Sequence, residues 1–481
     1  MQLKNKKLFE ERNFIGGEFF EKESKIKVHN PANQNLIGSV ANCDEIDTKN
    51  AIEKAQIAFE KWKKLAGKER SKLLKNWYDL ILQNQEDLAI ILSTEQGKPL
   101  AEARGEVIYG VQFVEWFAEE AKRNYGDTIP SHKQNQKIIT FNEPVGVVAA
   151  ITPWNFPSAM ITRKAAAAMA AGCTVVLKPS ELTPFSAIAL AVLANEAGIP
   201  AGVFNVITGD AGKIGAEFCR NKIVRKISFT GSTRVGKLLN QQCAEDLKRV
   251  SLELGGSAPF IVFSDADLEK AVKDLMHAKF RNGGQACTCV NRIFVEEKIH
   301  DEFVKKFVLE VAKLKVGNGL EGSPNMGPMI SKAAIEKVER LVMDAIKNGA
   351  KCEIGGKKIL ELGEQFFQPT VLTQISKDMA IAQEEIFGAV AAIQKFKSED
   401  EVIQLANDTE YGLGSYLYTS DNARIWRICD ALQFGMVGVN EPSFATEVAP
   451  FGGIKNSGMG REGSHLGILE FCQVKTLHIS F

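Results

Sequence analysis

The stretch Val145-Gly146-Val147-Val148-Ala149-Ala150-Ile151-Thr152-Pro153-Trp154-Asn155-Phe156-Pro157 sets the class of fold, because a short apolar run ends there in a proline-bounded turn. Val145 to Ile151 has the composition of a buried strand. Pro157 stands where a helix can begin without needing the N–H that proline lacks, and Gly172 is placed to end that helix. The pattern predicts a strand followed at once by a helix.

The same alternation of β-rich and helical runs continues to about residue 255. No repeat of fixed period and no low-complexity segment interrupts it. Repeated β–α–β order predicts an α/β fold, with a parallel sheet covered by helices on both faces. The expected elements are strands at Thr174–Leu177, Val203–Thr208, Lys226–Thr230 and Arg249–Leu254, and a helix at Pro184–Ala197.

Helices dominate the chain before this region, and a second α/β block follows it. The segment Asp44–Lys122 has the pattern of long amphipathic helices. Gly255-Gly256, between the two blocks, is the best candidate for a hinge. The elements expected in the second block are helices at Leu268–Phe280 and His300–Leu314 and a strand near Arg292–Val295.

The composition is that of an ordinary soluble globular protein. A chain of 481 residues is long enough for two or three domains. Lys+Arg and Asp+Glu both number 59, so no basic excess is present to hold nucleic acid or an anionic membrane. No apolar run approaches the roughly 18–20 residues that span a bilayer, and no signal core follows Met1–Lys7. Nine scattered cysteines fit a reducing compartment, so we expect a cytoplasmic protein.

Cys287 is the first candidate for chemistry. It follows the glycine-bearing stretch Phe280–Ala286, and such a thiol can act as a nucleophile if its pKa is lowered or a base takes its proton. A buried structural cysteine is the alternative. Cys289 allows a redox pair as a further alternative, although a disulfide between neighbours two residues apart would be strained. No second cysteine pair lies near, and His277 is the nearest histidine, so we expect no metal site.

Glu253 is the candidate for the base. It stands between Leu252 and Leu254, where burial would raise the pKa of a carboxyl group into the range of a general base. The alternation along this strand also puts Ser251 and Glu253 on one face together. The alternative interpretation is therefore that Ser251 and Glu253 lie on a solvated face of the strand.

Polar residues and glycines follow three of the predicted strands, where the ligands of open α/β sheets gather. Asn155 follows the first, and a side-chain amide there can donate a hydrogen bond to a developing oxyanion. Lys178 and Glu181 follow the second. Gly231 lets the backbone approach a ligand, and Ser232 can cap a helix whose N-terminus attracts phosphate. Each could also be an ordinary turn, and none matches a G-x-G-x-x-G or Walker loop.

Together these motifs resemble the aldehyde dehydrogenase superfamily over nearly the whole chain. The resemblance implies a Rossmann-like NAD-binding domain (1–122 and 143–255), a catalytic α/β domain (256–455) and a small β arm for oligomerisation (123–142 and 456–481). It also implies a homo-oligomer, either a dimer or a tetramer. The motifs that carry it, in family order and spacing, are Asn155, Lys178, Glu181, Gly231-Ser232, Glu253-Leu254-Gly255-Gly256, Gly284-Gln285-Ala286-Cys287, Glu384-Glu385-Ile386-Phe387-Gly388 and Pro450-Phe451-Gly452-Gly453.

The resemblance implies a role for each of these residues. Cys287 would be the nucleophile, Asn155 and the backbone N–H of Cys287 the oxyanion hole, and Glu253 the base that activates the deacylating water. Glu181 would accept a hydrogen bond from the adenosine ribose 2′-hydroxyl and would repel a 2′-phosphate, so we expect NAD rather than NADP. The residues implied to bind the dinucleotide are Thr152, Trp154, Lys178, Glu181, Gly231, Ser232, Glu385 and Phe387.

The surroundings of two arginines resemble the succinate-semialdehyde dehydrogenases in particular. There Arg163 and Arg281 would bind the distal carboxylate of the substrate, a task that suits guanidinium groups. Two ordinary surface cations are the alternative. Ala445 stands where that group usually has Ser, so one hydrogen bond is lost and glutarate semialdehyde or another aldehyde remains an alternative. The Cys287-Thr288-Cys289 segment also resembles the redox-sensitive loop of that group, and a disulfide there is a hypothesis.

The sequence therefore predicts oxidation of an aldehyde, with succinate semialdehyde as the first expectation, to its carboxylic acid. A dehydrogenase that transfers the acyl group to coenzyme A is one rival, although thiolysis would not need Glu253. A binding or structural protein of the same fold without activity is another. The presence of Asn155, Glu253 and Cys287 together argues against that second rival.

Overall fold

Strand β7 (Val147–Ile151) lies inside an eight-stranded sheet, as the stretch 145–157 predicts. The computed structural model, which describes residues 1–481, has the strand order β19-β11-β10-β7-β8-β9-β1-β2 in this sheet. Strands β7 to β11 pair in parallel, and the edge strands pair antiparallel. The other strands are β1 (Asn13–Ile15), β2 (Glu18–Phe20), β8 (Thr174–Lys178), β9 (Phe204–Val206), β10 (Val224–Thr230), β11 (Arg249–Glu253) and β19 (Gly458–Met459).

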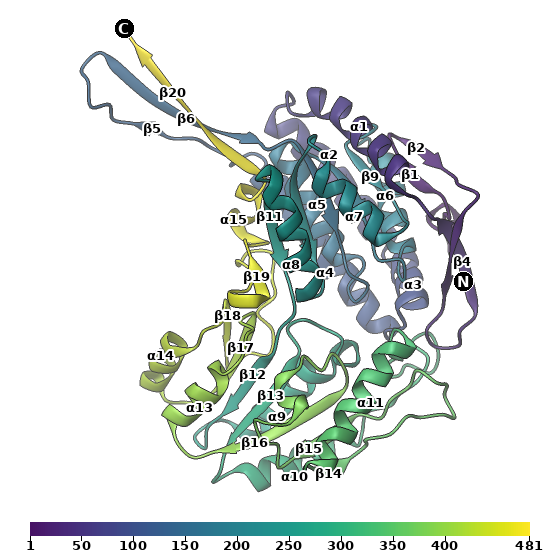
Figure 1. The fold of residues 1–481 in the computed structure, drawn as a ribbon, viewed down its shortest axis with the longest axis vertical. Helices are drawn as coiled ribbons and strands as arrows, with labels where there is room; N and C mark the ends of the chain where they lie inside the picture. Colours follow the sequence, from purple (N-terminus) through teal and green to yellow (C-terminus); the bar gives the residue numbers. More distant parts are fainter.

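Helices cover both faces of this sheet, as the β–α–β order predicts (Figure 1). Helix α5 ends at Gly172, whose φ of 100° is a conformation that glycine adopts without strain. One face carries α1 (Glu45–Trp62), α7 (Ala211–Arg220) and α8 (Thr233–Cys243). The other carries α2 (Gly67–Gln83), α3 (Gln85–Gln96), α4 (Leu100–Glu120), α5 (Ala159–Ala171) and α6 (Phe185–Glu196).

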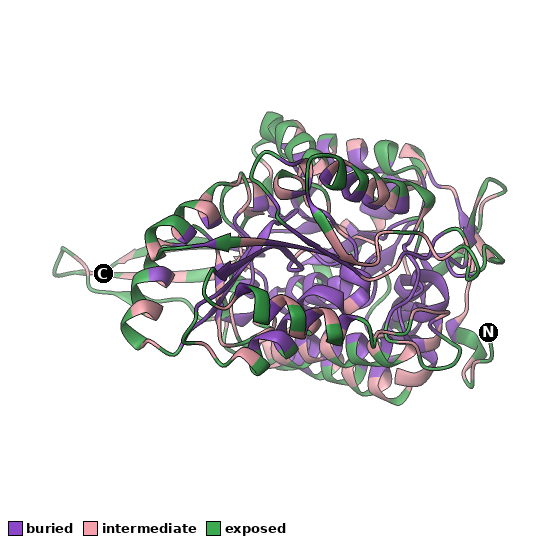
Figure 2. Cartoon of the chain, turned by 90° about the horizontal axis from the view of Figure 1, so that it is seen from below, coloured by how far each residue is buried: buried purple, intermediate pink, exposed green.

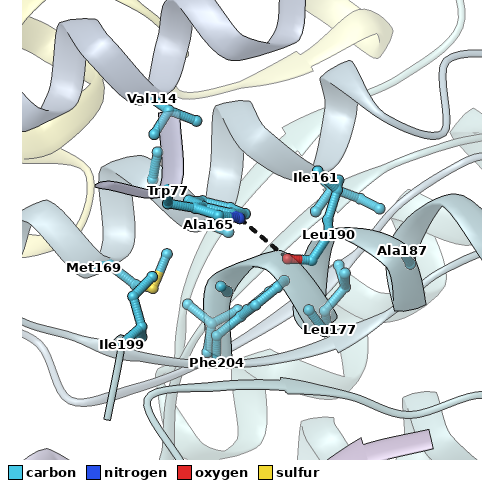
Figure 3. Close-up of a cluster of buried hydrophobic side chains, with 14 of the residues drawn as sticks. Trp77, Val114, Ile161, Ala165, Met169, Leu177, Ala187, Leu190, Ile199 and Phe204 are labelled. Carbon is cyan, nitrogen blue, oxygen red and sulfur yellow. Dashed lines mark hydrogen bonds between the residues drawn. The ribbon is translucent and has the colours of Figure 1, made fainter. Parts of the chain in front are cut away.

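Trp77 of α2 fills the core on the second of these faces (Figure 3). Its side chain is fully buried, and its indole Nε1 donates a hydrogen bond of 3.1 Å to the Leu190 carbonyl oxygen of α6. Its ring meets Phe204 of β9, with 5.7 Å between the ring centroids. One side chain thus joins two helices to the sheet.

A second sheet, of seven strands, forms the other large domain (Figure 1). Helix α9 (Leu268–Phe280) has the bounds that the sequence predicts, and it shares one face of the sheet with α10 (His300–Val311). The opposite face carries α11 (Lys332–Lys347), α12 (Ala380–Gln383), α13 (Glu399–Asn407) and α14 (Asn422–Ala431). In sheet order, the strands are β14 (Lys351–Ile354), β15 (Thr370–Thr373), β16 (Val390–Phe396), β13 (Val290–Glu296), β12 (Ala258–Val262), β17 (Gly414–Tyr418) and β18 (Met436–Val439).

A three-stranded arm projects from the first domain (Figure 1). It consists of β5 (Thr128–Ile129), β6 (Gln136–Pro144) and β20 (Cys472–Ser480), and its strands stay largely uncovered (Figure 2). The domain limits expected from the sequence remain a proposal. The C-terminal part of the arm begins only at Cys472. The residues just before it pack on the first domain instead, since β19 pairs with β11 and α15 (Ser464–Leu469) packs on α4 and α5.

The sequence analysis did not identify the strands near the N-terminus. Strands β1 and β2 extend the first sheet, while β3 (Lys25–His29) and β4 (Leu36–Ala41) form a separate hairpin. Short 3₁₀ turns complete the chain at Lys6–Leu8, Ala244–Asp246, Arg281–Gly284 and Lys455–Ser457. No helix combines the length and the apolar character needed to cross a bilayer.

Replacing Trp77 by alanine tests the importance of this core contact. We expect the Trp77→Ala variant to lose about 3–5 kcal/mol of unfolding free energy, because it leaves a cavity and removes the hydrogen bond to Leu190. Trp426→Ala is the matched control, since that side chain is 77% exposed and its loss should change stability by less than about 0.5 kcal/mol. Denaturant titration followed by circular dichroism measures both. Equal stability of the two variants would contradict the role given to Trp77.

Candidate active site

The parallel strands of the first sheet end in register, and this brings the predicted site residues together. Ile151 lies opposite Lys178 on one side and Phe229 on the other. Thr230 lies opposite Glu253 on the next strand. The turns that follow these strands therefore share one edge of the sheet, as their sequence positions predict.

A cavity of about 280 Å³ lies at this edge, between the two large domains. Most of the residues singled out in the sequence line it, and they come from both domains. Those on its wall are Trp154, Asn155, Arg163, Gly231, Ser232, Arg281, Cys287, Glu385, Phe387 and Ala445. Those that do not line it are Thr152, Lys178, Glu181, Glu253 and Cys289.

Cys287 reaches the cavity from a loop with an unusual backbone. Asn282, Gly283 and Gly284 all have positive φ angles, of 53°, 62° and 76°. A side chain at Gly284 would lie 2.2 Å from the carbonyl oxygen of Gly388, so the loop can pack there only with glycine. Burial, together with the carboxylates of Glu253 and Glu385, raises the pKa of the Cys287 thiol to about 12. The thiol is therefore protonated at neutral pH and needs a base.

The Asn155 side chain is buried and fixed at both ends of its amide. Its Oδ1 accepts a hydrogen bond of 3.1 Å from the Phe156 N–H, and its Nδ2 donates one of 3.0 Å to the Gln285 carbonyl oxygen. These two bonds define which end of the amide is the donor. The second hydrogen of Nδ2 remains available to an oxygen in the cavity.

Glu253 lies beside the cavity wall that Leu254 and Gly255 form. Only 4% of the residue is exposed, so the strand face is not a solvated one. Neither carboxylate oxygen has a hydrogen-bond partner. Burial first, and the negative charge of Glu462 second, raise the pKa of Glu253 well above its usual value. An unpartnered carboxyl group of this kind is a strong base once ionised.

Arg163 is also buried rather than a surface cation. Its Nη2 lies 2.8 Å from Glu462 Oε2, and its guanidinium lies over the Phe451 ring, 4.1 Å from the centroid. Lys164 forms an ion pair with the other oxygen of Glu462. Arg281, by contrast, has no ion-pair partner and lies over the Phe156 ring, 5.2 Å from the centroid. Arg281 therefore presents an uncompensated positive charge to the cavity, whereas Glu462 partly compensates the charge of Arg163.

The other end of the site has the features of a dinucleotide cradle. Ser232 caps α8, because its Oγ accepts a hydrogen bond from the Val235 N–H. Gly231 is packed against the Phe229 ring, where an added Cβ would lie 2.5 Å from Cζ. A helix N-terminus preceded by a glycine suits a pyrophosphate group, because its N–H groups and dipole favour negative charge.

Lys178 and Glu181 form an ion pair of 2.9 Å at the adjoining strand end. Partial burial opposes ionisation of Glu181, but the ammonium of Lys178 outweighs it and lowers the pKa of the carboxyl group. Glu181 is therefore ionised at neutral pH. A carboxylate beside an ammonium group fits a pair of ribose hydroxyls, since one accepts and the other donates hydrogen bonds.

Glu385 and Phe387 close the site from the second domain. Glu385 Oε1 accepts a hydrogen bond of 3.0 Å from the Gly256 N–H, and burial raises the pKa of Glu385 to about 7. The ring of Phe387 meets Trp154 edge-on, with 5.5 Å between the centroids. Gly255 allows this closure, because an added Cβ would lie 2.9 Å from Glu385 Oε2.

Cys289 points away from the reactive thiol. Its Sγ lies 3.3 Å from the Lys279 carbonyl oxygen, and both cysteines are free thiols in the structure. The redox pairing therefore remains a hypothesis. No group of three or more His, Cys, Asp or Glu side chains is placed to hold a metal ion.

Several residues of the site could not be predicted from the sequence. Lys164 and Glu462, which lie 298 residues apart in the chain, meet only in the folded protein. Lys337, whose Nζ donates to the Glu385 carbonyl oxygen at 2.6 Å, lies in the cavity wall with Tyr109. Both Lys337 and Tyr109 come from ordinary helical segments, and no local signal marks them.

Known proteins resemble this chain along its full length. The sequence model of the aldehyde dehydrogenase family matches residues 19–477. Glutarate-semialdehyde dehydrogenase of Pseudomonas putida is 53% identical over 482 residues, and NADP⁺ succinate-semialdehyde dehydrogenase of Escherichia coli is 51% identical over 481; each alignment spans 100% of both chains. The crystal structure of succinate-semialdehyde dehydrogenase from Burkholderia pseudomallei has a TM-score of 0.99 at 50% identity, again over 100% of both chains. This chain belongs to the aldehyde dehydrogenase family.

Proposed function

We propose that this protein oxidises the aldehyde group of a short semialdehyde, foremost succinate semialdehyde, to a carboxylate with NAD⁺. The observation that carries the proposal is one cavity lined by a thiol, a side-chain amide donor and an unpaired guanidinium. This combination suits a semialdehyde that carries a carboxylate at its other end. The thiol and the amide act on the aldehyde group, while the guanidinium holds the carboxylate by its charge. The names of the relatives at 51–53% identity support the same class of substrate.

In the first step the Cys287 sulfur bonds to the aldehyde carbon, and the electron pair of the C=O bond moves onto oxygen. Asn155 Nδ2 and the Cys287 backbone N–H donate hydrogen bonds to this oxyanion. The thiol proton goes to a base, because the pKa of Cys287 is about 12. Glu253 would accept this proton, and its raised pKa makes it, when ionised, a stronger base than an exposed glutamate.

Oxidation of the resulting thiohemiacetal leaves a thioester on Cys287. The dinucleotide, when bound, supplies the hydride acceptor for this step. After Glu253 has released the thiol proton to solvent, it takes a proton from water, the water oxygen bonds to the acyl carbon, and the C–S bond breaks to return Cys287 as a thiolate. Lys178, Glu181, Ser232 and Glu385 would hold the dinucleotide, while Thr152, Trp154, Gly231 and Phe387 shape its surroundings.

Arg281 would contribute more than Arg163 to binding the distal carboxylate of the substrate. Glu462 divides its negative charge between Arg163 and Lys164, whereas Arg281 has no ion-pair partner. Ala445 adds only a methyl group to the wall, where a serine would add a hydroxyl group that could help to fix the length of the substrate. Recognition by charge alone tolerates one more methylene, which makes glutarate semialdehyde the second candidate.

The oligomeric state is also a proposal. Strand β20 forms one edge of the arm, and its outer backbone groups have no partner strand. Exposed edge strands pair readily with other strands. We therefore expect the arm to add to a second copy of the chain, in a dimer or tetramer.

Replacing Asn155 by alanine tests the oxyanion hole. We expect Asn155→Ala to lower kcat by two to three orders of magnitude, because one such donor contributes about 3–4 kcal/mol. Asn195→Ala, at an exposed position on α6, is the control and should keep the kcat of the unmodified protein. Steady-state assays of NADH formation measure both. An Asn155→Ala variant with nearly full turnover would remove Asn155 from this role.

The choice of dinucleotide can be tested at Glu181. We expect kcat/KM to be higher with NAD⁺ than with NADP⁺, since the ionised carboxylate repels a 2′-phosphate. Glu181→Gln should reduce this preference by roughly tenfold or more, because it also frees the Lys178 ammonium to meet the phosphate. Glu196→Gln, an exposed change on α6, is the control. A native protein that prefers NADP⁺ would refute the assignment.

Arg281 can be tested with two aldehydes of equal length. We expect Arg281→Ala to lower kcat/KM for succinate semialdehyde by roughly 10- to 100-fold, since hydrogen bonds to charged groups contribute about 1.5–3 kcal/mol. Butanal has the same four carbons without the carboxylate, and its kcat/KM should change little. A parallel series with glutarate semialdehyde ranks the two candidate substrates. Equal losses for butanal and the semialdehydes would show that Arg281 does not read the carboxylate.

A further inference from the structure

A buried ion pair lies directly behind the turn that carries Asn155. Lys98, in the turn before α4, and Glu106, within α4, are each only 1% exposed at the side chain. Lys98 Nζ lies 2.5 Å from Glu106 Oε2. Removing two charges from water is costly, and a buried pair repays this only when further hydrogen bonds satisfy its remaining atoms. The further partners of this pair all belong to the segment 155–159.

Lys98 binds the backbone of Asn155 itself. Its Nζ donates a hydrogen bond of 2.7 Å to the Asn155 carbonyl oxygen, which also accepts one of 3.0 Å from Asn282 Nδ2. The N–H of the same peptide group, that of Phe156, donates to Asn155 Oδ1. A cation on the carbonyl oxygen polarises the peptide group and strengthens its N–H as a donor. Lys98 therefore fixes the peptide group that in turn fixes the amide side chain.

Glu106 holds the other end of the same segment. Its Oε1 accepts hydrogen bonds from the Ser158 N–H at 2.9 Å and the Ala159 N–H at 3.3 Å. These groups lie at the start of α5, where a negative charge also interacts favourably with the helix dipole. One ion pair thus clamps the turn from the Asn155 carbonyl to the first residue of α5.

We propose that Lys98 and Glu106 are positioning residues that hold the Asn155 amide toward the reacting oxygen. The inference rests on the role of Asn155 proposed above. Neither side chain of the pair lines the cavity itself; the pair reaches it through the segment 155–159, where Lys98 Nζ also lies 3.9 Å from the centroid of the Phe156 ring. A displacement of about 1 Å in such a group can cost on the order of 100-fold in rate.

The test removes both charges at once and measures the acylation step. In the double variant Lys98→Met/Glu106→Gln, methionine replaces the stem of the lysine and glutamine keeps an oxygen for the Ser158 and Ala159 N–H groups. No unpaired buried charge is left behind. We expect the pre-steady-state rate of NADH formation to fall about 10- to 100-fold. The KM for the dinucleotide should stay within about twofold, because the clamp holds only the Asn155 turn.

A double-mutant cycle separates positioning from general damage. The same pair of changes is made together with Asn155→Ala. If the clamp acts through the Asn155 amide, its removal should slow acylation less than about twofold once that amide is gone. A loss of the same size with and without Asn155 would overturn the proposal, and so would no loss at all.

Glu95→Gln is the matched control for disturbing a buried carboxylate. Glu95 is also buried and also accepts hydrogen bonds from a helix start, the Phe185 and Ser186 N–H groups of α6, away from Asn155. At saturating dinucleotide its change should leave the acylation rate within about twofold of the unmodified protein. A loss equal to that of the clamp variant would mean that stability alone is responsible, and would refute the inference.

A single change keeps the test decisive if the double variant does not fold. Glu106→Gln preserves volume and the acceptor for α5 while weakening the hold on Lys98, so we expect a smaller loss, of about 3- to 10-fold, that again depends on Asn155. An acylation rate equal to that of the unmodified protein would overturn the proposal. If Asn155→Ala itself leaves the acylation rate unchanged, the oxyanion hole is misassigned. If Asn155→Ala slows acylation and the variants at Lys98 and Glu106 do not, the role of Asn155 stands and only the positioning role of the ion pair is refuted.

Discussion

The site depends on the parallel register of the first sheet. Parallel strands point their carboxyl ends toward one edge, so side chains far apart in the chain meet there without any long-range signal between them. The pairing of Ile151 with Lys178 and of Thr230 with Glu253 aligns four strand ends. The second domain then needs to supply only a thiol from one side and Glu385 from the other. A shift of a single pair would move both Glu253 and Asn155 away from Cys287.

The buried charged residues behind this edge of the sheet differ in whether they have ion-pair or hydrogen-bond partners. Lys98 and Glu106 are buried and paired, so their desolvation is offset by an ion pair and further hydrogen bonds, and Arg163 and Lys164 share the buried carboxylate of Glu462. Glu253 is equally buried and has no hydrogen-bond partner at all. An unsatisfied buried carboxyl group destabilises the fold, and proteins keep such groups where the raised pKa is used. The contrast between these charges and the unpartnered one supports the proposal that Glu253 is the reactive carboxyl group.

Much of the fold and the outline of the site follow from local sequence. Helix α9 could be predicted to the residue because its apolar period is regular, and the end of α5 because Gly172 alone suits the left-handed turn. Asn155, Glu253 and Cys287 stand out because their neighbours are glycines, prolines or strand residues. Lys98 and Glu462 could not be found, since they reach the site only through packing of distant segments. Strands β1, β2 and β19 are two or three residues long and carry too little pattern to recognise.

The last two strands have a consequence for biosynthesis. Strand β19 completes the first sheet beside β11, and β20 pairs with β6 over nine residues, yet both come from the final 24 residues of the chain. During translation the rest of that sheet leaves the ribosome long before its last edge strand exists. Until then β11 and β6 lack their partner strands in the nascent chain, and unpaired strand edges are prone to mispairing. The first sheet and the arm can therefore be completed only after residues 458–480 have emerged, and not when the rest of the first domain has been made.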